Sequence, residues 1–371
     1  MAPHAGPLAG LRVVEFAGLG PAPYAAMLLA DLGADVIRIE RAREVQFIAP
    51  EHDLLNRGKR SVVLDLKQAS DIEIALRLLE RSDALLEGFR PGVMERLGLG
   101  PDVVLARKPQ LVFGRMTGWG QTGPMAARAG HDLNYLALTG ALHAIGAQGA
   151  APAVPLNLVA DFGGGGMLMA FGMMTALWRV ARGEPGQVVD AAMIDGAASL
   201  MTMTYSFFAA DRWNDRRGSN LLDGAAAHYA SYACSDGGWL AVAPLEPAFL
   251  TKFLGVLGIE AGVYGNAEDP AEWTRQRGLL ESRFAEAPRD EWVARFEGID
   301  ACVAPVLTMT EAPHFGHNAE RALFTEIPGR PGKYQPGPVP RFGATPAPAP
   351  RPSPTPGQHT TEVLAELGIA R

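Results

Sequence analysis

The sequence predicts an α/β protein with a mainly parallel, doubly wound sheet and a second, smaller α+β domain. Apolar segments with strand character alternate with segments of helical periodicity in the first half of the chain, the pattern of a parallel sheet. The polar stretch at residues 211–220 is typical of a linker, and a hairpin signal follows it. The length of 371 residues suggests two to three domains.

The first forty residues predict one βαβ unit. Residues 11–16 are apolar and fit a strand that is buried on both faces. Residues 24–32 have helical spacing and end at Gly33, a typical helix-terminating residue, and residues 34–40 alternate as a second strand. The alternation continues with strands expected at 61–66, 84–89, 110–116 and 187–193, and helices at 70–81, 101–108, about 167–180 and 194–209.

A different pattern begins near Ala225. Short strands are expected at 229–234 and 239–243, joined by the turn residues 235–238. The helices expected in this region lie at about 248–257, 271–286 and 290–296.

The C-terminal part of the chain is rich in proline. Nine of the 21 residues from 336 to 356 are proline, which favours an extended arm. Thr360 or Thr361 is then expected to cap a terminal helix at residues 362–367.

The composition excludes several classes of protein. Hydrophobic residues make up 48% of the chain, as in an ordinary globular protein, and the net charge of -7 argues against a general nucleic-acid or anionic-membrane binder. The N-terminus lacks a secretory pattern, and Cys234 and Cys302 lack metal-ligand spacing, so a cytoplasmic location is expected. The apolar run at 162–178 is short for a bilayer span and favours a buried helix, so no membrane span is expected.

Residues 133–160 contain no Asp, Glu, Lys or Arg, which predicts deep burial or an interface. Methionine and aromatic residues are dense between residues 167 and 213. They favour a core or subunit interface, or an adaptable surface for an acyl chain. The turn at 18–23 follows a strand as a dinucleotide loop would, but Pro23 stands where such a loop needs a small residue, so a plain βαβ turn is favoured.

Two segments have the residue types of acid–base chemistry. His131 and Asp132 stand at the start of a predicted helix, where they form either a general-base site or a satisfied capping cluster. Asp161 precedes the glycines 163–166, which permit close approach of a ligand, although an ordinary N-cap is the commoner role for such an acid. Glu246 lies between prolines and alone is typical of an exposed turn.

Residues 38–96 hold eleven basic and eleven acidic residues, so they form no net basic patch. Individual basic side chains there remain candidates for contacts with phosphate groups: Arg38, Lys67, Arg90 and Arg96.

These segments together resemble the family III CoA-transferase (CaiB/BaiF) superfamily. The resemblance runs nearly end to end and is carried by residues 7–41, 64–67, 87–92, 115–124 and 357–364. Within the superfamily, the chain resembles the α-methylacyl-CoA racemases.

The racemases have a Gly-His-Asp segment where this chain has His131 and Asp132, an aspartate at Asp161, and a small-domain glutamate at Glu246. The transferases share the aspartate but typically lack the histidine. They also have a glycine-rich loop where this chain reads 242–247 without glycine.

The resemblance implies an interlocked homodimer in which each chain has four parts. These are a large Rossmann-like CoA-binding domain at 1–210, a linker at 211–224, a small α+β domain at 225–320, and a return linker with a C-terminal helix at 321–371. It also implies that the CoA moiety of an acyl-CoA substrate contacts Arg38, Leu64, Asp65, Leu66, Lys67, Gly88, Phe89, Arg90, Arg96, Gly130, Leu133, Asn134 and Tyr135.

The implied reaction interconverts (2R)- and (2S)-2-methylacyl-CoA thioesters. His131 and Asp161 are the expected acid–base pair, and the backbone N–H of Asp132 is the expected donor to the enolate oxygen. Glu246 of the partner subunit is expected to bind the His131 ring, with Asp132 helping to position it. The CoA moiety is part of the substrate, and neither a separate cofactor nor a metal is expected.

Two alternative functions remain open from the sequence. One is a CoA-transferase in which Asp161 is the nucleophile and a second carboxylic acid is the acceptor. The other is a catalytically silent protein that binds CoA esters.

Overall fold

The computed structural model describes residues 5–42 and 48–369. The chain forms two compact units, and both are discontinuous in sequence. Unit 1 comprises Met1–Thr139, Leu156–Leu200 and Gly316–Arg371, and unit 2 comprises Gly140–Pro155 and Met201–Phe315. Residues 140–155 and 201–210, which the sequence analysis assigned to the large domain, therefore group with unit 2.

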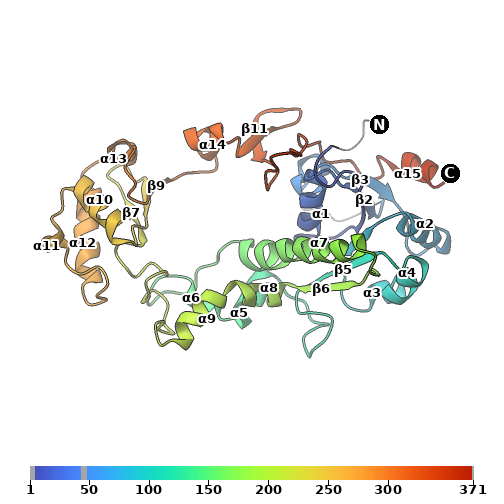
Figure 1. The fold of residues 1–371 in the computed structure, drawn as a ribbon, viewed down its shortest axis with the longest axis horizontal. Helices are drawn as coiled ribbons and strands as arrows, with labels where there is room; N and C mark the ends of the chain where they lie inside the picture. Colours follow the sequence, from blue (N-terminus) through green and yellow to red (C-terminus); the bar gives the residue numbers. More distant parts are fainter. Residues whose placement is uncertain (1–4, 43–47, 370–371) are drawn as a thin grey trace. The chain divides into compact units, whose positions relative to one another are not determined.

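Unit 1 is built on a six-stranded, all-parallel sheet with strand order β3-β2-β1-β4-β5-β6 (Figure 1). This is the order of the Rossmann fold, so the predicted fold class is confirmed. The strands are β1 (Arg12–Phe16), β2 (Asp35–Glu40), β3 (Arg60–Val63), β4 (Ala84–Glu87), β5 (Val112–Thr117) and β6 (Val188–Ala192).

Helices cover both faces of this sheet, which explains why its central strands are almost wholly buried. One face packs against α2 (Ala69–Glu80), α4 (Pro101–Arg107) and α15 (Thr360–Glu366), and their apolar side chains share one core with the strands. The other face packs against α1 (Pro21–Asp31) and α7 (Leu168–Ala181). The order of the sheet reverses between β1 and β4, and ligands of such folds bind beyond the carboxyl ends of the strands at this point.

The glycine run has a packing role that the sequence analysis did not foresee. Gly163–Gly166 lie in a wide π-helical segment, η3 (Leu158–Met167), which continues into α7, and none of the four glycines has a positive φ. A Cβ on Gly164 would meet the backbone of Ala197 at 2.6 Å, and one on Gly166 would meet the Tyr24 ring at 2.5 Å. The glycines therefore allow η3 to pack closely on α1 and on α8 (Met193–Leu200), and they are not a ligand-binding loop.

The continuous helix Leu158–Ala181 is the one helix of the described chain that is long and apolar enough to cross a membrane by length and composition. Its first part lies against α1 and α8, and its second part lies along β5 and β6. About a third of the helix is buried (33%), and Phe171 and Trp178 on its other side are exposed.

The sequence analysis expected the charge-free segment 133–160 to be either deeply buried or part of an interface. The segment is not deeply buried. Large apolar side chains within it are exposed in the single chain, among them Leu138 and Leu156, at 58% and 69%. Exposed apolar side chains of this kind are typical of an interface, the other expectation for this segment.

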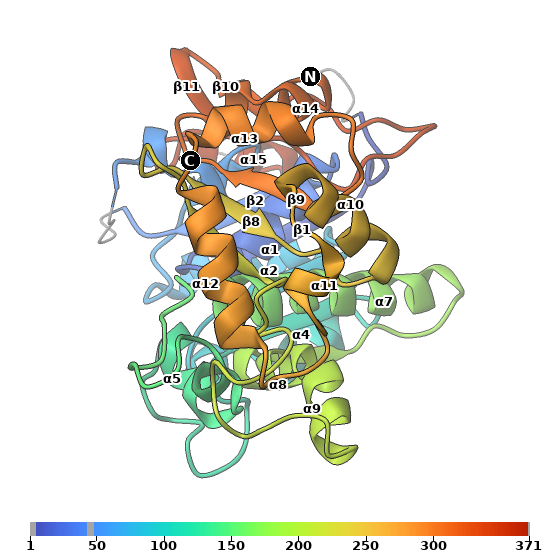
Figure 2. The same cartoon turned by 90° about the vertical axis from the view of Figure 1, so that its left-hand side faces the viewer.

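Unit 2 contains a three-stranded antiparallel sheet of β7 (Ala230–Ala233), β8 (Trp239–Val242) and β9 (Val303–Val306), with α12 (Trp273–Phe284) and α13 (Arg289–Phe296) beside it (Figure 2). The predicted hairpin β7–β8 is present, whereas β9 was not predicted. The other helices of this unit are α6 (Ala141–Ala144), α9 (Thr202–Ala209), α10 (Pro247–Leu257), α11 (Ala261–Tyr264) and η4 (Ala312–His314). The helix expected at 194–209 is interrupted at Met201, where α8 ends and α9 begins.

The C-terminal segment returns to unit 1 through α14 (Gly316–Glu320) and the hairpin of β10 (Phe324–Ile327) and β11 (Arg330–Pro336). Residues 357–360 then bind the edge strand β3: His359 Nδ1 accepts the Ser61 N–H at 3.1 Å, and Thr360 Oγ1 accepts the Val63 N–H at 3.1 Å. Thr360 therefore bonds to β3 and does not cap α15, which is preceded by His359. Arg60 fastens α15 further through ion pairs with Glu362 and Glu366.

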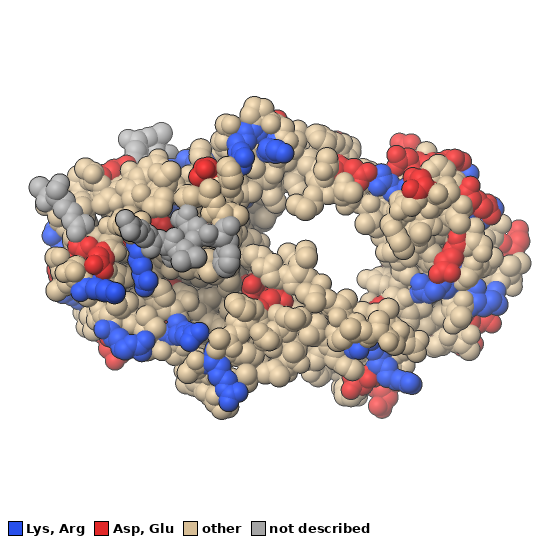
Figure 3. Space-filling model, turned by 180° about the vertical axis from the view of Figure 1, so that it is seen from behind, with Lys and Arg blue, Asp and Glu red and all other residues tan. Residues whose placement is uncertain are grey.

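Figure 3 shows basic and acidic side chains interspersed over the face in view.

We expect Gly196→Ala to destabilise the protein, because the new methyl group would overlap the Gly164 carbonyl oxygen where α8 crosses η3. Overpacking of this kind costs roughly 1–3 kcal/mol. Gly278→Ala in α12 is the control, because a Cβ there meets nothing within 4 Å, and it should stabilise the chain by up to about 1 kcal/mol. Thermal unfolding measures both, and a wild-type midpoint for Gly196→Ala would contradict the packing role.

Candidate functional site

Two cavities open at the carboxyl ends of the strands of unit 1. We call them the His131 cavity, of about 480 Å³, and the Lys67 cavity, of about 600 Å³. The His131 cavity is lined by the turn before α1, the segment before α5 (Asp132–Leu138) and the start of η3, including Gly18, Leu19, Gly20, Pro21, Pro23, Arg38, Gly130, His131, Tyr135, Asn157, Asp161, Phe162 and Met193. The Lys67 cavity is lined by Phe16, Ala17, Ile39, Glu40, Arg41, Ala42, Val63, Leu64, Asp65, Leu66, Lys67, Phe89, Val93 and Leu97.

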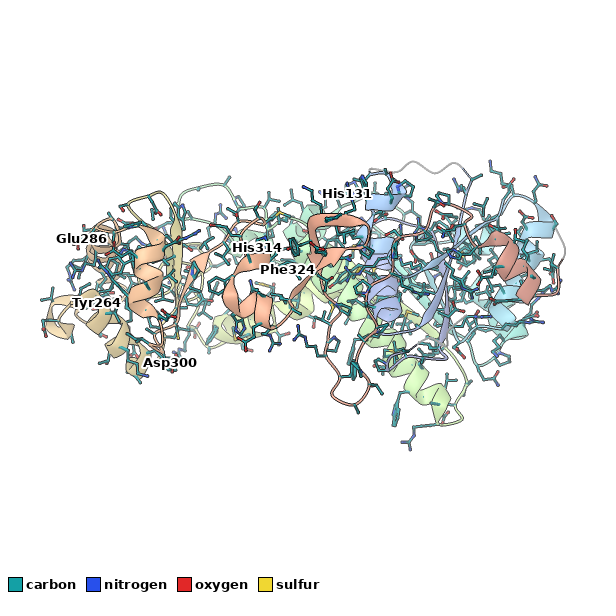
Figure 4. The ribbon with its side chains drawn as sticks, turned by 90° about the horizontal axis from the view of Figure 1, so that it is seen from above. His131, Tyr264, Glu286, Asp300, His314 and Phe324 are labelled. Atoms are coloured by element: carbon teal, nitrogen blue, oxygen red, sulfur yellow. The ribbon has the colours of Figure 1, made fainter. Side chains whose placement is uncertain are left out.

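His131 directly precedes α5, and its side chain is exposed to the cavity that bears its name. Figure 4, in which it is labelled, shows it beside the blue ribbon of the N-terminal part of the chain. Its backbone N–H donates to Asn134 Oδ1 at 3.1 Å, which caps the first turn of the helix. His131 therefore lines the cavity from the residue that starts α5.

The residues around His131 fix the approach of the chain to α5. Tyr135 donates its hydroxyl to the Gly130 carbonyl at 2.5 Å, and its ring packs edge-on against Trp119 with centroids 4.7 Å apart. A Cβ on Gly130 would lie 2.8 Å from both rings, so only glycine fits there. Burial raises the pKa of Tyr135 to about 12, so its hydroxyl stays protonated and keeps this bond.

Asp132 is buried, and its hydrogen bonds are with backbone groups and not with the His131 ring, which the sequence analysis expected it to position. Its Oδ2 accepts the backbone N–H groups of Ala160 and Asp161, each at 2.8 Å. Its other carboxylate oxygen is buried without a hydrogen bond among the described residues. The carboxylate therefore fixes the backbone of Asp161, and among the described residues the His131 ring donates no hydrogen bond to it.

Asp161 is half-buried in the first turn of η3 and faces the same cavity as His131. Burial raises the pKa of its carboxyl, and the negative charge of Asp132 raises it further. A hydrogen bond from Asn157 Nδ2 at 3.3 Å and the nearby His131 act in the opposite direction. Two titratable groups with different environments thus share one cavity, an arrangement suited to acid–base chemistry.

The backbone N–H of Asp132 is the first of α5. The first N–H groups of a helix have no partner within it. Among the described residues, no hydrogen bond from this group is recorded, which leaves it open to an oxygen of a ligand.

Arg38 lines the His131 cavity, as do Gly130 and Tyr135 among the other expected CoA contacts. Its guanidinium is buried between two carboxylates, with Nη1 3.0 Å from Glu15 Oε1 and Nε 3.4 Å from Glu40 Oε2. Glu15 also pairs with the buried Lys59 at 2.6 Å. Much of the charge of Arg38 is therefore balanced inside the protein.

The Lys67 cavity brings together most of the loop residues that were expected to contact CoA. Leu64, Asp65, Leu66, Lys67 and Phe89 all line it, and the Lys67 backbone N–H donates to Asp65 Oδ1 at 3.1 Å. Gly88, Arg90 and Arg96 lie in the same segment as Phe89 but do not line the cavity. Leu133 and Asn134 are exposed on α5 and line neither cavity.

Glu246 lies in unit 2, where it immediately precedes α10, and its side chain is exposed. Its backbone carbonyl accepts the Leu250 N–H at 2.9 Å, which starts the helix. The described residues contain no group of three or more His, Cys, Asp or Glu side chains that could hold a metal ion.

Sequence reasoning missed Asn157 and Arg41. Asn157 precedes Asp161 by four residues, the spacing that places two side chains on one face of a helix, and this was the available signal. Arg41 lines the Lys67 cavity directly after β2, where a basic side chain at the carboxyl end of a parallel strand was a usable sign of anion binding.

Comparison with known proteins places the chain in a family. The model of CoA-transferase family III matches residues 8–360. The chain is 43% identical over 369 residues to an alpha-methylacyl-CoA racemase of Mus musculus, covering 98% of this chain and 94% of the relative, and 42% identical over 365 residues to that of Homo sapiens, with the same coverage. A CAIB/BAIF family protein from Brucella suis has the same fold, with a TM-score of 0.83, 26% identity and coverage of 98% of this chain and 100% of the other. The chain belongs to CoA-transferase family III.

We expect Asp132→Asn to lower the pKa of Asp161. The amide oxygen can still accept the N–H groups of Ala160 and Asp161, but the negative charge that raises this pKa is gone. The carboxyl ¹³C titration of labelled aspartates measures the shift, with Asp161→Asn to assign the signal. Asp65→Asn in the Lys67 cavity is the control and should leave the Asp161 titration unchanged. An unshifted midpoint in Asp132→Asn would mean that the two carboxyls are not coupled.

Proposed function

We propose that this member of CoA-transferase family III interconverts (2R)- and (2S)-2-methylacyl-CoA thioesters and is therefore an isomerase. The observation that carries the proposal is the shared cavity of His131 and Asp161, which come from separate elements of unit 1. The similarity to racemases of mouse and man over nearly the whole chain supports it.

The chemistry requires a base on one face of the α-carbon and an acid on the other. His131 removes the α-proton of the (2S) ester while Asp161, in its protonated form, donates a proton to the opposite face. The reverse reaction begins with ionised Asp161 and protonated His131. Both directions use a pair that holds one proton in total, so proton number and charge balance in each turnover.

The environment of Asp161 suits this exchange of roles. Burial and the Asp132 charge raise the pKa of its carboxyl above the usual range, so the protonated form costs less near neutral pH. The two N–H bonds to Asp132 hold its backbone in place while its proton comes and goes.

The enolate that forms between the two proton transfers carries its charge on the thioester oxygen. The free N–H of Asp132 at the start of α5 is the proposed donor to that oxygen. One such donor in a site that excludes water is worth ~3 kcal/mol of transition-state stabilisation. Phe162 and Met193 offer the apolar wall for the acyl group.

The Lys67 cavity is the proposed site for the nucleotide end of the CoA moiety, which makes CoA part of the substrate and not a separate cofactor. Its backbone carbonyl groups at 64–67 suit the amino group of the adenine, and Lys67, Arg41, Arg90 and Arg96 supply positive charge for the phosphates.

We further propose that the protein is an interlocked homodimer that acts on lipid-derived thioesters in the cytoplasm. The exposed aromatic and aliphatic side chains of unit 1 support a large interface, among them Phe171, Trp178 and Leu200, at 70%, 63% and 57% exposure. In the proposed dimer, Glu246 of the partner subunit binds the His131 ring and sets its tautomer.

The alternative function is transfer of CoA between carboxylic acids, and the description of the matched family favours it. Asp161 would attack the thioester carbonyl and release CoA as the thiolate, forming a mixed anhydride, and the thiolate would then form an aspartyl-CoA thioester and release the donor acid. The acceptor acid would complete the transfer by the same two steps. Trapping of an Asp161 adduct with hydroxylamine or borohydride distinguishes this route from proton transfer.

The first prediction concerns deuterium exchange without any acceptor acid. Wild type in D₂O should racemise one pure enantiomer of a 2-methylacyl-CoA and incorporate deuterium at the α-carbon. His131→Ala should lose racemisation by at least ~10²-fold, yet still exchange the (2R) ester with retention, because Asp161 remains on that face. Asp161→Asn should exchange only the (2S) ester.

The control for this experiment is His143→Ala, which replaces an exposed histidine of unit 2 and should behave as wild type. Racemisation by His131→Ala at the wild-type rate would overturn the assignment, as would the absence of exchange in wild type.

The second prediction concerns the dimer. Consider a dimer that contains one His131→Ala chain and one Glu246→Ala chain. If each site takes His131 from one chain and Glu246 from the other, one of the two sites carries both substitutions and the other site is wild type. Co-expression with two affinity tags should therefore yield heterodimers with about half the wild-type activity per dimer, whereas each homodimeric variant stays low. Heterodimers no more active than the two homodimers would contradict the shared site.

A further inference from the structure

Two buried charged side chains of unit 1 take no part in the proposed reaction. Glu87 is the last residue of β4 and has no exposed surface, and Arg115 lies opposite it on β5 and is 7% exposed. Charged residues are rarely buried to this extent unless they are paired. Their position at the carboxyl ends of two central strands raises the question of what they hold.

Arg115 joins two carboxylates with one guanidinium. Its Nε donates to Glu87 Oε1 at 3.0 Å, and its two Nη atoms donate to both oxygens of Glu95, at 2.8 and 3.3 Å. The second oxygen of Glu87 accepts the Phe89 N–H at 2.7 Å. The planar guanidinium thus fixes the end of β4, the loop after it and the short helix α3 (Val93–Arg96), which contains Glu95.

The segment held in this way forms one wall of the Lys67 cavity. Phe89, Val93 and Leu97 all line the cavity, and the Val93 N–H donates to the Arg90 carbonyl at 3.1 Å. Gly92 turns the chain between them with a φ of 79°. Apolar packing holds the middle of the segment, since Phe89 packs against the Phe16 ring and Met94 has no exposed surface. The polar bonds of Glu87 and Glu95 fix its two ends.

We propose that Arg115, through Glu87 and Glu95, is a positioning residue that sets segment 88–97 as the wall against which the nucleotide end of the CoA moiety binds. The inference rests on the proposed function, because it assigns the Lys67 cavity to CoA. It predicts that the Arg115 bonds govern recognition of the CoA moiety and leave proton transfer at His131 and Asp161 unaffected.

The sharpest variant is Glu95→Gln. The Glu95 side chain is 45% exposed, so its substitution releases α3 from Arg115 without leaving a buried charge unpaired. Glu73→Gln is the matched control, because Glu73 forms a similar two-bond contact with Arg107, at 2.8 and 2.9 Å, away from both cavities.

The readout compares two substrates with the same reacting centre. One is a 2-methylacyl-CoA, and the other is its N-acetylcysteamine thioester, which lacks the nucleotide. Glu95→Gln should raise KM for the CoA ester on the order of tenfold, the worth of a charge-assisted contact, with little change in kcat. The N-acetylcysteamine ester should be turned over as by wild type, and Glu73→Gln should match wild type with both substrates.

A second variant guards against misfolding. The pair Glu87→Gln with Arg115→Met removes both buried charges and keeps an acceptor for the Phe89 N–H, and it should show the same selective loss. Equal losses with both esters, or no change in KM for Glu95→Gln, would overturn the inference.

Direct titration with free CoA separates this inference from the proposed function. If wild type binds CoA but does not exchange α-protons, the proposed racemase function is wrong. The role of Arg115 in positioning segment 88–97 is still supported in that case if Glu95→Gln weakens CoA binding on the order of tenfold. If wild type racemises and Glu95→Gln binds CoA as tightly as wild type, the inference fails alone.

Discussion

The organisation of the candidate site depends on two hydrogen bonds to one buried carboxylate. Asp132 Oδ2 accepts the N–H groups of Ala160 and Asp161, residues 28 and 29 positions away in the chain. Because Asp132 directly follows His131, these bonds join the segments that present the two titratable side chains of the cavity. The long excursion of residues 140–155 into unit 2 leaves and re-enters unit 1 between them, so the local geometry depends on this contact and not on chain continuity.

The close packing of η3 gives the same site its rigidity. Its glycines bring the helix backbone against α1 and α8, and the turn that begins α1 lies beside Asp161, where a Cβ on Gly20 would come within 3.7 Å of the carboxylate. The packing of η3 against α1 and α8 thus accompanies both its wide turns and the partial burial of Asp161. The same burial raises the pKa of that carboxyl, so packing and acid–base behaviour have a common origin here.

Periodic patterns predicted the fold well, and long-range polar contacts escaped prediction. The central strands of the parallel sheet, such as β1 and β4, were found from the sequence because they are buried on both faces and form apolar runs. Strand β9 was missed because Pro305 lies within its four residues. The role of Asp132 could not be read from its neighbours, because its partners lie across the fold. The same holds for Arg115, whose two carboxylates precede it by 28 and 20 residues.

The return of the C-terminal segment to β3 has a consequence for the biosynthesis of the protein. His359 and Thr360 bond to this edge strand, Arg60 pairs with α15, and Val363 and Leu367 fill the core beneath the sheet. Unit 1 thus lacks part of its core until residues 357–367 have left the ribosome, whereas the main segment of unit 2, Met201–Phe315, is complete earlier. Unit 1 therefore starts before unit 2 and is completed after it, and a chain that stops before residue 357 would expose an apolar edge of its central sheet to other nascent chains.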